Sequence, residues 1–153
     1  MIQRIQSVYL FVAAALTCCL FGLPFAGIGN GFLTFSVTAC HLSPKVPGMN
    51  STTMLPLAIA TLCVAVLCLI NIFLFGNRTR QMKVVKLNIV LQVVMLLSMI
   101  AYSIGLQRGM GMGASIHPRF AFAIPVVNVI LLILAYKGIK ADDDLVKSAD
   151  RLR

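Results

Sequence analysis

Long stretches without a charged residue constrain this sequence more than any other feature. Four of them hold 40, 32, 21 and 17 residues, at 5–44, 46–77, 87–107 and 120–136. A helix needs about 20 predominantly apolar residues to cross the hydrocarbon core of a bilayer, with a range of roughly 17 to 25. The last two stretches therefore fit one membrane crossing each, whereas each of the first two is longer than one crossing.

Helix-breaking residues divide the two longer stretches. Glycines and Asn30 interrupt the apolar pattern at 27–31, and the polar, proline-containing run at 44–53 is unsuited to a helix interior. Backbone groups in lipid must satisfy their own hydrogen bonds, so we expect every span to be helical. Pro24 and Pro125 are expected to bend the first and the last helix. The expected spans are 7–27, 54–75, 86–106 and 120–137.

Composition also indicates lipid as the solvent of most side chains. The chain is 59% apolar and 11% charged, with a mean hydropathy of +0.96, whereas soluble domains run near one quarter charged. These values exclude a soluble enzyme and a disordered chain. The net charge of +9 does not predict a nucleic-acid partner, because the basic residues flank apolar stretches and form no patch. The first apolar run is longer than that of a signal peptide, so we expect its helix to be retained.

Basic residues near the span ends predict the orientation of the chain. If the N-terminus, the loop between the second and third spans and the C-terminus share one side, that side holds ten Lys and Arg. The opposite side then holds three, which are Lys45, Arg108 and Arg119. We therefore expect both termini in the cytoplasm and the lipid bilayer as the first partner of the protein.

The expected spans contain amides but no charged side chain. All four carboxylates follow residue 141, which weighs against a proton-driven transporter and leaves no carboxylate pair for acid–base catalysis in the membrane. Asn88 and Gln92 share one face of the third helix because they are four residues apart, and Asn128 lies near the middle of the fourth. These candidate intramembrane polar contacts line a polar pocket or pathway, or they form interhelical hydrogen bonds that fix packing.

Cysteine and histidine spacing predicts neither redox chemistry nor a metal site. Four of the five cysteines fall near the middle of the first two spans, at 18, 19, 63 and 68. These cysteines form no C-x-x-C pair, and burial in lipid suppresses thiol reactivity. We therefore interpret them as small apolar side chains that fill space in the helix packing, and not as a thiol oxidoreductase site. Cys40 and His41 match no zinc pattern. We therefore expect no catalytic residues, no metal and no cofactor.

The loop between the first two spans is too long for a plain turn. Polar and apolar residues alternate over Thr34–Ala39, which predicts a short strand. We expect this strand to lie over the outer end of the bundle, as a lid or as a simple cover, and to pair with Ala114–Ile116.

The tail, residues 138–153, predicts an amphipathic helix. Acidic residues are concentrated near the start of this segment and basic residues near its end, an order that the helix dipole favours. Leu145, Ala149 and Leu152 give one narrow apolar face. This helix lies on the inner leaflet, folds back on the loop between spans two and three, or docks a partner. Both termini contribute to a candidate cytoplasmic interaction face. Its members are Gln3, Arg4, Gln6, Asp150, Arg151 and Arg153.

The two ends of the chain resemble those of a known bacterial family. The motifs are MIQRIQSVYL at 1–10 and LVKSADRLR at 145–153. They are similar to the ends of an uncharacterised domain-of-unknown-function family of small four-span membrane proteins, and the likeness runs over the whole chain. The resemblance implies a bacterial inner-membrane location with both ends inside, and it implies no activity.

These features predict an all-α membrane protein with a single integral membrane domain over 1–153. The fold would be a four transmembrane helix bundle with a short β-strand in the first outer loop and a cytoplasmic C-terminal amphipathic helix. We expect a non-enzymatic accessory or scaffold protein that contacts a protein partner or anionic lipid through its cytoplasmic face. The alternative is a small carrier or binding protein for an apolar solute or lipid. The oligomeric state stays open.

Overall fold

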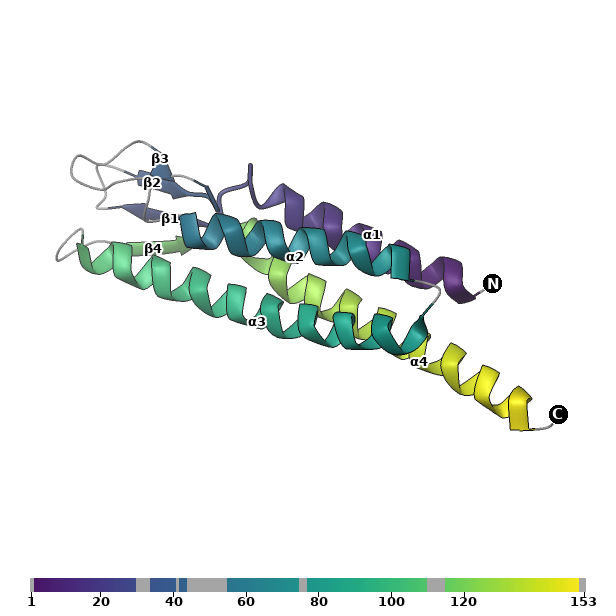
Figure 1. The fold of residues 1–153 in the computed structure, drawn as a ribbon. Coiled ribbons are helices and arrows are strands. Elements are labelled where there is room, and N and C mark those ends of the chain that lie inside the picture. Colours follow the sequence, from purple (N-terminus) through teal and green to yellow (C-terminus); the bar gives the residue numbers. More distant parts are fainter. Residues whose placement is uncertain are drawn as a thin grey trace.

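Four helices run alternately up and down along one axis in a computed structural model of the chain (Figure 1). The structure describes residues 2–29, 34–40, 42–43, 55–74, 77–109 and 115–151. The helices are α1 (Ile2–Cys19), α2 (Leu55–Phe73), α3 (Arg78–Gly109) and α4 (Ile124–Arg151). The main contacts join α1 to α2 and α4, and α3 to the same two. The bundle is therefore a ring in which each helix packs against two neighbours. We call the end that holds both termini the terminal end and the opposite one the sheet end.

Buried positions follow a repeat of three and four residues. In α3 they include 81, 85, 88, 92, 95 and 99, and in the last helical segment 121, 125, 128, 132, 135 and 139. This period of 3.5 residues is that of a left-handed coiled coil. The outward positions are mostly apolar as well, and the side chains of Phe11, Ile59 and Leu97 are 62%, 59% and 59% exposed. The bundle thus presents apolar side chains to its surroundings along its length.

Within the described residues, three helices are long and apolar enough to cross a bilayer. They are Leu55–Phe73, Arg78–Gly109 and the segment Phe120–Ser148. The second expected span, 54–75, agrees with α2, whose second residue is Pro56 in the first turn, where proline is tolerated. The apolar part of α1, Ile5–Cys19, is shorter than the other three.

Helix α1 ends earlier than the sequence predicts. The expected span reached residue 27, but turn hydrogen bonds from Leu20 N to Thr17 O (3.1 Å) and from Gly22 N to Cys19 O (3.2 Å) close the helix. Pro24 lies beyond this end, so the expected proline bend in α1 is wrong. At about 1.5 Å per residue, the 18 residues of α1 extend for about 27 Å.

Helices α3 and α4 are longer than expected. Asn77 caps α3, since its Oδ1 accepts a hydrogen bond from Arg80 N (3.2 Å), and the basic segment before residue 86 is helical. The 3-10 helix η3 (Phe120–Ala123) leads into α4, which runs without a break to Arg151. The tail helix is thus the end of α4 and not a separate element. Pro125 lies in the first turn of α4, where it breaks no helical hydrogen bond, so no bend is required there.

A four-stranded sheet covers the sheet end of the bundle. Its order is β3-β2-β1-β4, all neighbours are antiparallel, and the strands are β1 (Ala26–Gly29), β2 (Thr34–Val37), β3 (Leu42–Ser43) and β4 (Ser115–Pro118). The predicted strand at 34–39 is confirmed as β2. Its predicted pairing with 114–116 is wrong, because β1 lies between them and pairs with both. Strand β1 is buried at every residue, so it lacks the polar alternation that would have predicted a strand.

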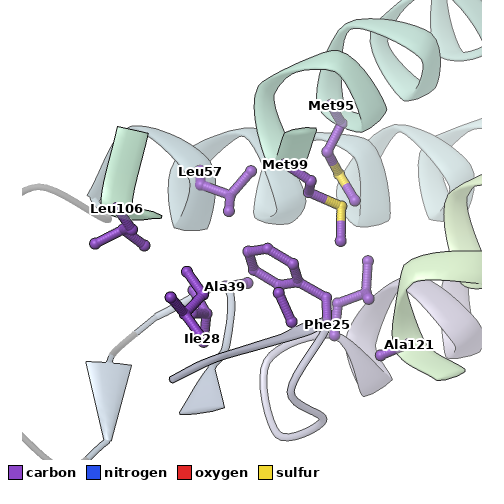
Figure 2. Close-up of a cluster of buried hydrophobic side chains, with 11 residues drawn as sticks. Phe25, Ile28, Ala39, Leu57, Met95, Met99, Leu106 and Ala121 are labelled. Atoms are coloured by element: carbon purple, nitrogen blue, oxygen red, sulfur yellow. The ribbon is translucent and has the colours of Figure 1, made fainter. Parts of the chain in front are cut away.

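Two apolar clusters fill the bundle. The first lies under the sheet, where the Phe25 side chain is fully buried and points toward Met99 and Leu57 (Figure 2). The second lies toward the terminal end and contains Leu10, Ala13, Ala14, Cys68, Val85, Leu132, Ala135 and Ile139. Between the two clusters, buried polar side chains lie beside the apolar Val64 and Ala65 of α2.

Candidate functional site

Every helix contributes a buried polar side chain to the zone between the two apolar clusters. These side chains are at most 1% exposed. On each helix they fall between residues of the first and of the second cluster; Thr17, for example, follows Ala14 and precedes Leu20. We call this set the central polar layer, and its members are Thr17, Thr61, Asn88, Gln92 and Asn128.

Hydrogen bonds made by side chains of the central polar layer join neighbouring helices. Asn128 Nδ2 donates to Thr17 Oγ1 at 2.9 Å, which links α4 to α1. Asn88 Nδ2 lies 2.8 Å from Cys68 Sγ, which links α3 to α2. The hydroxyl of Thr17 also donates to the Ala13 carbonyl one turn back (2.8 Å). Asn88 and Asn128 both lie buried in the interior of the bundle.

Several amide atoms in this layer have no hydrogen-bond partner among the described residues. They are Asn88 Oδ1, Asn128 Oδ1 and both polar atoms of Gln92. A buried polar atom left unpaired costs about 1–3 kcal/mol, so within this layer Gln92 carries the largest such cost; outside it, both side-chain polar atoms of the buried Asn71 also lack partners among the described residues. The structure places Asn88, Gln92 and Asn128 in one buried interior.

A second buried polar layer lies at the terminal end, and most of it was not predicted from the sequence. Gln81 Nε2 donates to the Asn71 carbonyl at 3.2 Å, and Asn71 is fully buried. Gln6 is 4% exposed and packs on Gly138, where an added Cβ would come within 3.0 Å of Gln6 Cγ. We call Gln6, Asn71 and Gln81 the terminal polar layer. Gln81 was detectable, because it precedes Asn88 by one heptad.

The candidate cytoplasmic face is only partly described. Gln6 lies buried in the interface between α1 and α4, because Gly138 has no side chain and so leaves room for it. The backbones of Gln3 and Arg4 lie in the first turn of α1, and those of Asp150 and Arg151 in the last turn of α4, at the same end of the bundle (Figure 1). The side chains of these four residues and the whole of Arg153 lie outside the described part.

One ion pair joins the tail to the start of α3. Arg78 Nη2 lies 3.1 Å from Asp142 Oδ2, and Arg78 Nη1 donates to the Asp142 carbonyl at 3.0 Å. This double contact holds α4 beside α3 where the expected membrane span of α4 has already ended. Beyond it, Leu145 and Val146 are 58% and 44% exposed. The basic side chains described at this end are Arg78, Arg80, Lys83, Lys86, Lys137, Lys140 and Lys147.

The described cysteines are all free thiols. Cys18, Cys19 and Cys63 are exposed on the outside of the bundle, and Cys68 is buried in the second cluster. Within the described ranges, no three side chains of His, Cys, Asp or Glu come together as metal ligands. His41 lies outside these ranges.

A protein-family model described as "Domain of unknown function (DUF4293)" matches residues 2–152. The chain belongs to the DUF4293 family. The match runs from the first turn of α1 to beyond the end of α4, so the sheet and the tail both fall within the DUF4293 domain. The predicted membership in a domain-of-unknown-function family is thereby confirmed. Comparisons of the chain with curated proteins and with solved structures gave no match.

Proposed function

We propose that this DUF4293 protein is a multi-pass membrane protein that acts as a non-enzymatic accessory or scaffold protein. In this proposal its four helices cross the bacterial inner membrane, and the projecting end of α4 docks a partner protein in the cytoplasm. The proposal has three parts, which concern insertion, orientation and docking.

Insertion is supported by the distribution of polarity across the bundle. Exposed positions along all four helices carry large apolar side chains, while the buried polar side chains among the described residues are amides and hydroxyls. In water the reverse arrangement would be favoured, because apolar surface is removed from solvent on folding. In lipid, interhelical contacts between amides and hydroxyls stabilise a bundle whose outside is apolar.

Orientation is supported by the two ends of the bundle. Ten of the thirteen Lys and Arg lie at the start of α1, in the first nine residues of α3, and from residue 137 to the C-terminus. The start of α1, the start of α3 and the end of α4 lie at the same end of the bundle in Figure 1. Under the positive-inside rule this end faces the cytoplasm and the sheet end faces outward.

Docking is supported by the length and direction of α4, which is the observation that carries the proposal. The helix has 28 residues, or about 42 Å at 1.5 Å per residue, whereas the hydrocarbon core is about 30 Å thick. The C-terminal part of α4 continues without a break past the N-terminal start of α1 (Figure 1). The contact between Arg78 and Asp142 holds α4 in that direction. A tail lying flat on the membrane would have to bend near Ala141. In this proposal the exposed side chains of Leu145 and Val146 are available for contact with a protein in the cytoplasm.

The test compares three forms of the protein as baits in mild-detergent extracts of bacterial membranes. These are the full chain, a chain that ends at Lys140, and the double variant Leu145→Ser with Val146→Ser. We expect the last two to lose the same specific partners, and the exposed control variant Lys147→Ser to keep them. Identical partner sets for the full and the shortened chain would overturn the proposal. If shortening instead removed only a preference for anionic vesicles, the tail would be a lipid-binding element.

A second candidate function, a carrier or binding protein for a small solute, is favoured by Gln92. Its side chain is fully buried and both of its polar atoms lack partners among the described residues, which is the state expected of a group that pairs with a ligand. Solute uptake and drug sensitivity of cells that carry Gln92→Leu together with Asn128→Leu test this candidate. Unchanged values in both assays would remove its basis.

A further inference from the structure

We propose that the sheet end carries a site for one anionic phospholipid, whose phosphate pairs with Arg119 and whose acyl chain lies in the groove beside it. This inference rests on the membrane insertion proposed above, and it is independent of the docking of α4. It concerns the opposite end of the molecule.

An open groove of about 760 Å³ begins at the end of β4. Its lining residues are Pro118, Arg119, Phe120, Phe122, Ala123 and Val126. This volume falls in the range of about 300–1,000 Å³ that is usual for small-molecule sites. The Phe120 side chain is fully exposed, and Val126 is 46% exposed on a face of α4 that continues in Ile130. A lipid chain on the outer surface of α4 can therefore enter the groove from the side.

The position of Arg119 is fixed by the sheet and by η3. Its backbone N–H donates to the Phe25 carbonyl at 3.0 Å, and its carbonyl accepts from Phe122 N at 2.9 Å. The guanidinium lies across β1 at Gly27, where an added Cβ would be 3.4 Å from Arg119 Nε and 3.7 Å from Nη2. The glycine thus leaves room for the arginine side chain at the rim of the groove.

The chain supplies no side-chain anion at this end. All four of its carboxylates lie at 142–150, and α4 carries them to the terminal end of the bundle (Figure 1). The exposed cations Arg108 and Arg119 therefore take their counter-ions from the surroundings. For Arg119, beside an apolar groove at the edge of the membrane, the lipid phosphate is the matching anion, because a guanidinium binds phosphate through two parallel hydrogen bonds.

An anionic lipid is preferred over a zwitterionic one for an electrostatic reason. The ammonium group of a choline headgroup offsets its own phosphate, whereas phosphatidylglycerol keeps a net negative charge. One basic residue near a membrane surface favours anionic lipid by about fivefold in association constant. We expect this preference at the groove and not on the outward face of α2.

The test uses the absence of tryptophan from the chain. Phe120→Trp places the only tryptophan of that variant in the groove at a fully exposed position, and Ile59→Trp places one on the exposed face of α2 near the same end. The full chain is reconstituted in vesicles that contain brominated phosphatidylglycerol or brominated phosphatidylcholine, and quenching gives the relative association constant at each site. We expect about a fivefold preference for phosphatidylglycerol at Trp in position 120 and nearly equal quenching at position 59.

The variant Arg119→Gln, made on the Phe120→Trp background, identifies the charge responsible. We expect it to abolish the preference, and we expect inorganic phosphate in the buffer to leave the preference of the parent unchanged. Equal quenching by both lipids at position 120, or a preference that survives Arg119→Gln, would overturn the lipid site. Loss of the preference in phosphate would assign Arg119 to a soluble anion. An absence of quenching at both positions would instead overturn membrane insertion.

Discussion

Replacing Gln92 by Leu is expected to stabilise the bundle, although it removes a polar group from the central polar layer. Gln92 is fully buried, and neither of its amide atoms has a partner among the described residues. When such a side chain is replaced by an apolar one of similar size, no hydrogen bond is lost and the penalty for a buried unpaired group is removed. That penalty is about 1–3 kcal/mol, so the free energy of unfolding should rise by an amount in this range.

Unfolding in mixed micelles with increasing SDS measures this effect, because the separated α3 then exposes Gln92 to water and headgroups. Asn128→Leu is the matched control, because it removes the 2.9 Å hydrogen bond to Thr17. Its free energy of unfolding should therefore rise by less than that of Gln92→Leu, or fall. If Gln92→Leu lowered the free energy of unfolding by more than about 1 kcal/mol, Gln92 would have a partner in the folded protein. That result would refute the reasoning from burial and would strengthen the case for a bound solute.

Three further predictions concern the terminal end. Gly138→Ala should lower the free energy of unfolding by about 1–3 kcal/mol, measured by the same SDS titration, because the new Cβ would approach Gln6 Cγ to 3.0 Å. Arg78→Ala should speed amide hydrogen exchange in α4 beyond Asp142, measured by mass spectrometry, while costing under about 1 kcal/mol because the ion pair is partly exposed. A green fluorescent protein fused after Arg153 should fluoresce in cells, since it folds in the cytoplasm.

Each of these predictions has its own control. Gly22→Ala should leave stability nearly unchanged, because nothing lies within 4 Å of its added Cβ, and an equal loss at both glycines would contradict the packing argument. Unchanged exchange beyond Asp142 in the Arg78 variant would mean that α4 holds its direction without the ion pair. Alkaline phosphatase is active only outside the cytoplasm, so activity of this enzyme fused at the same C-terminal position would contradict the proposed orientation.

The helices were largely predictable because their apolar runs are long, whereas the ends of the helices were not. Helix α2 was found within two residues at each end, since polar residues flank it on both sides. The end of α1 was missed because Ala26 and Ile28, with two glycines, continue the apolar run as the buried strand β1. A strand buried on both faces has the same composition as the end of an apolar helix, so hydropathy does not separate them.

The interior was predictable only where an amide interrupts an apolar span. Asn88, Gln92 and Asn128 stood out for this reason. Thr17 did not, because a threonine hydroxyl pairs with its own helix and is common in apolar segments. Gln6 was assigned to a surface, since its burial depends on Gly138 of α4, more than a hundred residues away. The seven-residue spacing of Gln81 and Asn88 was present in the sequence, but apolar residues on every face of α3 obscured the repeat.

The pairing of β1 with β4 has a consequence for how the protein is made. Residues 26–29 leave the ribosome long before residues 115–118, because both α2 and α3 are synthesised between them. Until β4 arrives, one edge of β1 keeps bare N–H and C=O groups, which are available to any other extended chain. Contacts between such distant segments form late because a long loop must close first. The sheet end is thus completed only after α3 has been made, and translation that stops short of β4 would leave a product prone to mispairing.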